Sequence, residues 1–177
     1  CFAALLREAN PPARASADNT HSLFIDGEGR LSSCGADPDQ EGRLGHGEGV
    51  TRLNTPTRLP STLGGERAVS VSAGVRHSLA LTADSSVWSW GDGGHGCLGH
   101  GDGGGQLLPK KVEALAGQRV VAVAAGWSHS LALTADGAVW SWGVGFYGKL
   151  GHGDRRGQRQ PKTVEGFAGQ RGGEGGA

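Results

Sequence analysis

The sequence has no methionine, a single tyrosine and only three cysteines among its 177 residues. Its 17 basic and 17 acidic side chains leave no net formal charge, so no overall attraction to nucleic acid or acidic membranes is expected. No apolar run approaches the roughly 20 residues that a membrane-spanning helix needs. The chain starts at Cys1 without an initiator methionine, which predicts a fragment or a processed product, and no signal peptide is visible.

The cysteines, Cys1, Cys34 and Cys97, show no paired spacing. This pattern argues against a disulfide framework and a zinc site, and it fits a reducing compartment. We therefore expect a protein without metal or cofactor, located inside the cell in the cytoplasm or nucleus. Glycine, by contrast, is abundant, with 34 residues at recurring positions, which is typical of turns between short strands.

Two stretches of the chain have nearly the same amino-acid sequence. His77 and His129 mark them and lie 129 − 77 = 52 residues apart, and His21 marks an earlier, more diverged copy. A fixed period of this length indicates a repeat architecture. The predicted segments are an N-terminal segment with a short helix (1–12), a diverged first repeat (13–64), a second repeat (65–116), a third repeat (117–169) and a glycine-rich tail (170–177).

Each copy reads as four short strands without helical periodicity. In the third copy the expected strands are 120–125, 129–134, 138–142 and an edge strand that begins at Pro161. Asp136 and Gly137 predict a two-residue hairpin turn with positive φ at both positions. Four antiparallel strands per copy are typical of a propeller blade.

The repeated positions also match a known family. In the third copy they are Val120, Val123, Gly126, His129, Ala132, Leu133, Trp142, Gly143, Leu150, Gly151, Gly153, Pro161 and Val164. This pattern resembles the RCC1 repeat, named after the regulator of chromosome condensation. The resemblance implies an all-β fold, an RCC1-type β-propeller segment of about three four-stranded antiparallel blades. Because that family's rings usually have about seven blades, the chain is expected to form a partial ring.

Six of the seven histidines occupy repeat positions, which favours structural over catalytic or metal-binding roles. Structural roles are expected at His21, His77, His129, Gly45, Gly99 and Gly151. Gly91, Gly93 and Gly96 match a dinucleotide-binding pattern, but no helix follows to bind a pyrophosphate. Ser128 and Ser130 flank their histidine on or next to a strand, so alternation points neighbouring side chains apart and no Ser-His-Asp site is expected.

One basic cluster and one tryptophan are candidate partner-binding residues. Arg155, Arg156, Arg159 and Lys162 form either an ordinary solvated loop or a contact for an acidic protein face or nucleosomal DNA. Trp127, in Gly-Trp-Ser-His-Ser, resembles the Gly-Trp-Arg-His-Thr motif of the plant ultraviolet-B receptor, an RCC1-like propeller. The corresponding positions in the other copies lack tryptophan, which disfavours photoreception.

The resemblance implies a non-enzymatic protein-interaction module, a fragment of a longer RCC1-like regulatory protein. The alternative is guanine-nucleotide exchange on a Ran-like small GTPase, although the copies contain no wedge-like insertion of the kind used by the founding member. A third alternative is an ultraviolet-B photoreceptor. We expect a protein partner, at most weak contact with nucleic acid and no membrane. Self-association is also expected, through blade sides left uncovered, mainly that of residues 117–169.

Overall fold

The computed structural model describes residues 14–61 and 63–166, which form three four-stranded antiparallel sheets. The first sheet contains β1 (Ala15–Ala17), β2 (His21–Ile25), β3 (Leu31–Ala36) and β4 (Arg52–Arg58). The second contains β5 (Ala68–Ala73), β6 (His77–Thr82), β7 (Val87–Gly91) and β8 (Gln106–Lys111). The third contains β9 (Val120–Ala125), β10 (His129–Thr134), β11 (Val139–Gly143) and β12 (Gln158–Thr163).

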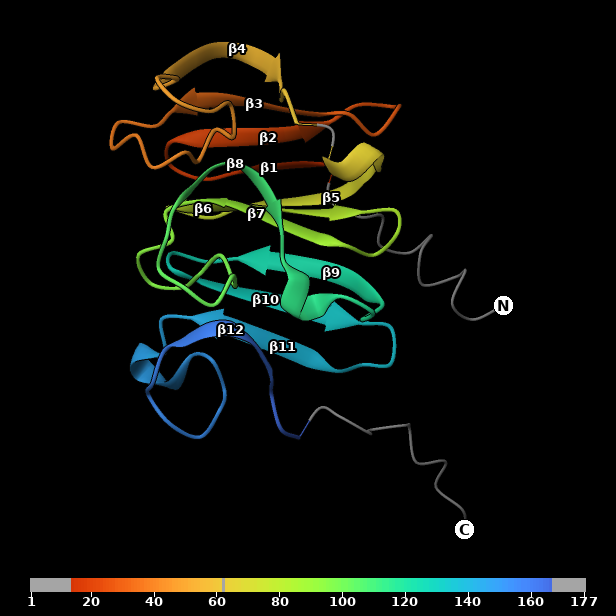
Figure 1. Cartoon of the computed structure of the whole chain (residues 1–177), viewed down its shortest axis with the longest axis vertical. Helices are drawn as coiled ribbons and strands as arrows, with labels where there is room; N and C mark the ends of the chain where they lie inside the picture. The colour runs from red at the N-terminus through yellow and green to blue at the C-terminus, as the bar shows by residue number, and fades with distance from the viewer. Residues whose placement is uncertain (1–13, 62, 167–177) are drawn as a thin grey trace.

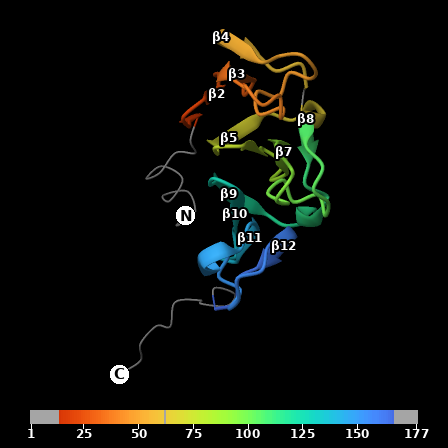
Figure 2. The same cartoon turned by 90° about the vertical axis from the view of Figure 1, so that its left-hand side faces the viewer.

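Figure 1 shows the sheets, here called blades, stacked in the order of the sequence. Figure 2 shows the same order from the side. Three short 3-10 helices complete the fold: η1 (Leu63–Gly65), η2 (Glu113–Leu115) and η3 (Phe146–Gly148). The prediction of an all-β protein with three four-stranded antiparallel blades is confirmed. The expected N-terminal helix and the glycine-rich tail lie outside the described residues.

The hairpin turn of the third blade differs from the prediction. Gly137 has a positive φ of 89°, but Asp136 does not, so the expectation for Asp136 was wrong. The amide of Gly137 bonds the carbonyl of Thr134 at 3.0 Å, and the amide of Thr134 bonds the carbonyl of Ala138. The turn is therefore longer than two residues and needs only one left-handed position. In the second blade Ser85 takes that position with φ 69°.

Apolar side chains gather between the blades in two clusters. Leu23, Ile25 and Leu31 of the first blade pack against Val71, Ala80 and Trp90 of the second. The second cluster repeats this arrangement one blade later, with Leu79, Leu81, Val87, Val112, Leu115, Val120, Ala132 and Trp142. Burial of this apolar area is the main force that joins neighbouring blades. Each blade therefore depends on its neighbours for its core.

The antiparallel order gives every blade two different ends. At one end, called the loop end, lie the first connection and the long third connection of each blade; in the third blade these are residues 126–128 and 144–157. The loop end lies on the left in Figure 1. The opposite, turn end carries the hairpin turns and the links between blades. Within the described residues no helix is long and apolar enough to cross a membrane.

Candidate functional site

The repeat histidines at the starts of β2 and β6 link one blade to the next. Nε2 of His77 lies 2.8 Å from Oγ of Ser130, and His21 makes the same contact with Ser78. The Ser130 hydroxyl donates its proton to the carbonyl of Cys97 at 2.8 Å. Because a hydroxyl has one proton, the imidazole must be the donor in its contact, which places the histidine proton on Nε2.

We call each of these contacts between neighbouring blades a joint. A tryptophan of the later blade also takes part in each joint. The indole nitrogen of Trp142 donates to the same Cys97 carbonyl at 2.7 Å, and its ring is fully buried. A Cβ on Gly99 would lie 2.9 Å from that indole nitrogen, so only glycine allows the ring to approach this closely. Trp90 meets the Arg43 carbonyl and Gly45 in the same way at the first joint.

The second set of repeat histidines acts within each blade. Nε2 of His100 lies 3.1 Å from Oγ of Ser89, and that hydroxyl also bonds the carbonyl of Leu98 at 2.7 Å. His46 and His152 repeat the arrangement in the first and third blades. These histidines fasten the long loop to the third strand. The six repeat histidines thus fall into two sets of three corresponding positions, and five of the six contact a serine hydroxyl.

His129 differs from its two equivalents. Its ring is half-buried, and none of the described residues forms a hydrogen bond with it, whereas His77 is fully buried and bonded. We therefore expect His77→Ala to lower the free energy of unfolding by about 1–3 kcal/mol, the cost of a lost buried hydrogen bond. His129→Ala should cost clearly less. Denaturant midpoints of both variants will measure the difference, and equal losses would contradict the hydrogen-bond explanation.

The described residues contain no cluster of potential metal ligands, and one of their two cysteine thiols is buried. No group of three or more His, Cys, Asp or Glu side chains within the two described segments could hold a metal ion. Cys97 is buried, its thiol donates to the Asp92 carbonyl at 3.0 Å, and burial raises its pKa to about 12. Such a thiol is protonated at neutral pH and is a poor nucleophile.

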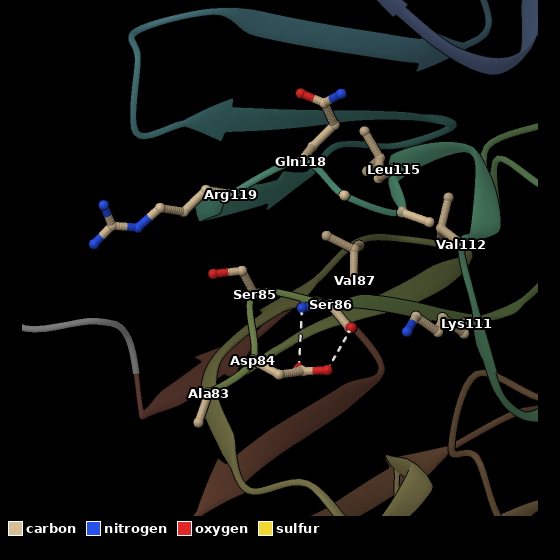
Figure 3. Close-up of a pocket in the computed structure, with 12 residues that line it drawn as sticks. Ala83, Asp84, Ser85, Ser86, Val87, Lys111, Val112, Leu115, Gln118 and Arg119 are labelled. Carbon is tan, nitrogen blue, oxygen red and sulfur yellow. Dashed lines mark hydrogen bonds between the residues drawn. The ribbon is translucent and has the colours of Figure 1, made fainter.

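A hollow of about 380 Å³ lies at the turn end between the second and third blades. Figure 3 shows Val87, Val112 and Leu115 between the polar residues of its rim, with Arg119 extending away from Asp84. The oxygens of Asp84 already accept bonds from Thr82 and Ser86, which hold its carboxyl pKa below the usual value. No set of polar groups converges here, so the hollow does not resemble a ligand site.

At the loop end of the first two blades lies an acidic network. The guanidinium of Arg43 is buried and pairs with Asp37, Asp39 and Glu41 at 2.8–3.0 Å. Arg76 pairs with Asp92 at 3.0 Å in the second blade. Burial first, and then the charge of Asp92, raise the pKa of Glu41. The network has more carboxylates than guanidinium groups, so this part of the loop end is acidic.

The loop end of the third blade carries exposed aromatic and basic side chains instead of acidic ones. Trp127 and Phe146 are each 66% exposed and Tyr147 is 95% exposed. A backbone bond of 2.8 Å between Val144 and Ser128 joins the two loops that carry these rings. Three exposed arginines lie on the same end, and together we call the six residues the aromatic–arginine patch: Trp127, Phe146, Tyr147, Arg155, Arg156 and Arg159.

The patch borders a groove between the second and third blades. The groove measures about 250 Å³ and is lined by Gly94, His95, Val144, Gly145, Phe146, Gly157 and Arg159. The backbone of Arg159 is fixed there, because its carbonyl accepts the Gly101 amide at 3.0 Å. Tyr147 has a φ of 65°, an uncommon conformation for a residue with a side chain. An exposed tyrosine held in such a conformation suggests a role outside the fold.

The second blade has different residues at the positions that correspond to the patch. Fifty-two residues before the six patch residues stand Val75, Gly94, His95, Gly103, Gly104 and Leu107. The histidine, the serine that follows it and both tryptophans are the same in the two copies, whereas the first strands differ at Ala68/Val120, Ser70/Ala122 and Ser72/Ala124. At the loop end the third blade differs from the second at all six patch positions. Surface differences concentrated in loops on a common framework are typical of binding surfaces.

The structure brings some of the partner-binding residues predicted from the sequence together and separates one of them from the rest. It brings Trp127, Arg155, Arg156 and Arg159 to one end, but Lys162 lies within β12 opposite Ser141, away from the loop end. Lys162 also has an equivalent in the second blade, Lys110, so it does not distinguish the third blade. Phe146 and Tyr147 were missed. Their signal was available in the sequence, since they replace Gly94 and His95 of the preceding copy.

Comparison with known proteins agrees with this architecture. The family described as the regulator of chromosome condensation (RCC1) repeat matches residues 28–81, 84–133 and 136–172. Human E3 ubiquitin-protein ligase HERC2 is 41% identical over 155 residues, which cover 86% of this chain and 3% of the ligase. The ultraviolet-B receptor UVR8 of Arabidopsis thaliana is 42% identical over 130 residues, which cover 73% of this chain and 29% of the receptor.

A solved structure shows the same fold. Prp20p of Saccharomyces cerevisiae, the yeast RCC1, superposes with a TM-score of 0.74 at 25% identity, over 85% of this chain and 37% of its own. That protein was studied together with its binding to Gsp1p and histones. The chain thus spans well under half the length of each of these three relatives. It belongs to the RCC1 repeat family and forms a segment of an RCC1-type β-propeller.

Proposed function

We propose that this chain is a non-enzymatic binding module that holds an acidic segment of a protein partner against the aromatic–arginine patch. One observation carries the proposal: where the second blade has three glycines, a valine, a histidine and a leucine, the third has three rings and three guanidinium groups. Tryptophan, tyrosine and arginine are the residues that most often dominate binding energy at protein interfaces. The ligase activity of HERC2 belongs to a protein of which this chain matches only 3%.

A protein partner suits the patch better than nucleic acid does. Three arginines would neutralise few phosphates, which supports only weak and salt-sensitive binding. The acidic network of Asp39, Glu41 and Asp92 lies at the same end of the neighbouring blades and would repel a longer polyanion. A short acidic peptide with an apolar side chain could instead pair with the arginines while its apolar group covers Phe146 or Trp127.

The experiment compares the two ligand classes directly. Fluorescence anisotropy will follow the full chain binding a labelled peptide rich in Asp and Glu with one Phe, and a single-stranded oligonucleotide of equal charge. We expect tighter binding of the peptide, weakened at least tenfold by Phe146→Ala together with Arg156→Ala. The matched control is Lys110→Ala with Lys162→Ala, which should leave the affinity unchanged. Preference for the oligonucleotide, or equal losses in both double variants, would refute the proposal.

Nucleotide exchange is the second candidate. It is supported by the superposition on Prp20p, whose binding to Gsp1p was studied. An exchange factor would act by displacing phosphate and magnesium contacts of the nucleotide, and acidic side chains such as those around Arg43 could compete for such contacts. Release of labelled GDP from a Ran-like GTPase, with and without the chain, tests this candidate. Unchanged release rates would exclude it for this segment.

We also propose that the chain alone self-associates through the side of the third blade that faces away from the second. Leu133 is 39% exposed there, whereas its equivalent Leu81 is 3% exposed beneath the third blade. Val121 is 40% exposed on the same face. Exposed apolar surface of this kind drives association. Light scattering over a concentration series should show growing mass, which Leu133→Glu should suppress. A monomer at high concentration would contradict this expectation.

A further inference from the structure

The fourth strand of the first blade carries the only dipeptide of the chain in which a serine or threonine precedes a proline. This dipeptide is Thr55–Pro56, and a basic residue, Arg58, follows the threonine at the third position. The cross-strand registers place Leu108 and Gln160 at the corresponding positions of the second and third blades. The hydroxyl at this position therefore belongs to the first blade alone, and the blade fold does not require it.

Thr55 lies on the free edge of its sheet. β4 is the outermost strand of the first blade, and Figure 1 shows no strand of that sheet beyond it. The side chains of Thr55 and Pro56 are exposed. Within the described part of the chain the Thr55 carbonyl accepts a hydrogen bond from the Thr57 hydroxyl at 3.1 Å, but the Thr55 hydroxyl itself makes none. It is therefore free to react.

The backbone around Thr55 does not take part in the strand ladder. Leu53 is paired with Gly35 and Thr57 with Ser33, so three residues of β4 lie opposite a single residue of β3. Such a bulge leaves the extra residues unpaired. A residue that precedes proline is also restricted to extended conformations. The segment is thus extended and exposed, and it can move away from the edge without loss of a registered pair.

These features match the requirements of a proline-directed serine/threonine kinase. A kinase of this class binds its substrate in an extended conformation and accepts proline directly after the target residue, where no amide N–H is available. A basic side chain three residues after the target adds a charge-assisted contact. Arg58 stands at that distance from Thr55, and its side chain is exposed.

We propose that Thr55 is a phosphorylation site for a kinase of this class. The Thr55 hydroxyl attacks the γ-phosphorus of magnesium-bound ATP. The new Oγ–P bond forms as the bond between the γ-phosphorus and the bridging oxygen breaks, ADP leaves, and the hydroxyl proton passes to a carboxylate of the kinase.

The modification changes the charge of this edge. Phosphothreonine carries about two negative charges at neutral pH. The charged residues of β4 are Arg52 and Arg58, both exposed, so the strand changes from basic to nearly neutral. Phosphorylation would therefore act on partners that contact the outer edge of the first blade. This proposal does not rest on binding at the aromatic–arginine patch.

The experiment treats the full chain with magnesium ATP and a purified kinase of this class and follows the mass of the protein. We expect phosphate at Thr55, added within about threefold of the rate for a synthetic peptide of residues 50–60, because no opening of the fold is needed. Thr55→Ala should abolish the reaction, and Arg58→Ala should slow it about tenfold. Phosphorylation of the peptide but not of the chain would overturn the proposal, as would phosphorylation of neither.

The other two blades offer matched variants at the same position of the fold. In a Thr55→Ala chain, Leu108→Thr places a hydroxyl before a proline with Lys111 three residues later, and phosphorylation should return. Gln160→Thr also places a hydroxyl before a proline, but Thr163 stands three residues later, so the reaction should be at least about tenfold slower. Equal rates in the two variants, or no reaction with Leu108→Thr, would contradict the proposal, since the edge position and the residues that follow would then not determine the target.

Discussion

Replacing Trp142 by alanine is expected to lower the free energy of unfolding by about 3–5 kcal/mol, the usual cost of truncating a large buried aromatic side chain. The ring is fully buried between the second and third blades, and its indole donates to the Cys97 carbonyl at 2.7 Å. Its loss leaves a cavity and removes one of the two donors to the Cys97 carbonyl, which keeps only the Ser130 hydroxyl. Because a repeat protein is held together by contacts between neighbours, the third blade should separate first.

Urea denaturation combined with amide exchange will measure this effect. Exchange within β10 and β11 should become faster than exchange within β2 and β3 in the Trp142→Ala variant. Trp140→Ala is the matched control, since Trp140 lies two residues earlier on the same strand, is only half-buried and has no partner for its indole nitrogen among the described residues. Its cost should be clearly smaller. Equal losses in the free energy of unfolding for the two variants would contradict a specific stabilising role of Trp142 at the joint.

Acid is expected to destabilise the protein between about pH 6.5 and pH 4 through His77. Burial of this imidazole lowers its pKa from 6.5 to about 4, and the nearby His129 and His21 add to the effect. Below pH 6.5 the histidine binds a proton in the unfolded chain but not in the folded protein. The contribution of His77 to the free energy of unfolding is therefore fully present above pH 6.5 and decreases as the pH falls toward 4. A pKa difference of this size corresponds to about 3 kcal/mol.

A variant that keeps a hydrogen-bond donor isolates this contribution. His77→Gln retains an N–H near Ser130 but cannot titrate, so its stability should fall less than that of the unchanged protein as pH is lowered from 7 to 4.5. Denaturant midpoints at several pH values give the difference. His129→Gln is the control, because its ring is only half-buried, whereas that of His77 is fully buried; burial lowers the pKa of His129 as well. A stability difference between His77→Gln and the unchanged protein that does not vary with pH would contradict the explanation.

The arrangement of strands could be predicted from the sequence because each copy repeats the same alternation of apolar and small residues. The period, the three blades and the antiparallel order all follow from that pattern and are found in the structure. The joints could not be predicted. Their partners lie about one repeat apart, as with His77 and Ser130, and many serines in the chain could have supplied the hydroxyl.

Single departures from the repeat were also hard to interpret. Asp18 stands where the other copies have glycine. Its amide bonds the His21 carbonyl at 3.0 Å, as the glycines do in their copies, and its carboxylate also accepts the amides of Thr20 and His21 at 2.9 Å. Phe146 was missed for another reason. An aromatic residue in a repeat of buried strands reads as part of the core, whereas this one lies on a loop and remains exposed. Position within the repeat, more than residue type, locates the candidate site.

The most direct test of the account replaces the six residues of the aromatic–arginine patch by their second-blade equivalents: Trp127→Val, Phe146→Gly, Tyr147→His, Arg155→Gly, Arg156→Gly and Arg159→Leu. Because the second blade already carries these residues at corresponding positions, the fold and thermal midpoint should change little. Affinity for the acidic, phenylalanine-containing peptide should fall by at least about 100-fold, roughly 2.7 kcal/mol of binding free energy. An unchanged affinity in a well-folded variant would contradict the account, because the partner would then bind elsewhere on the blades.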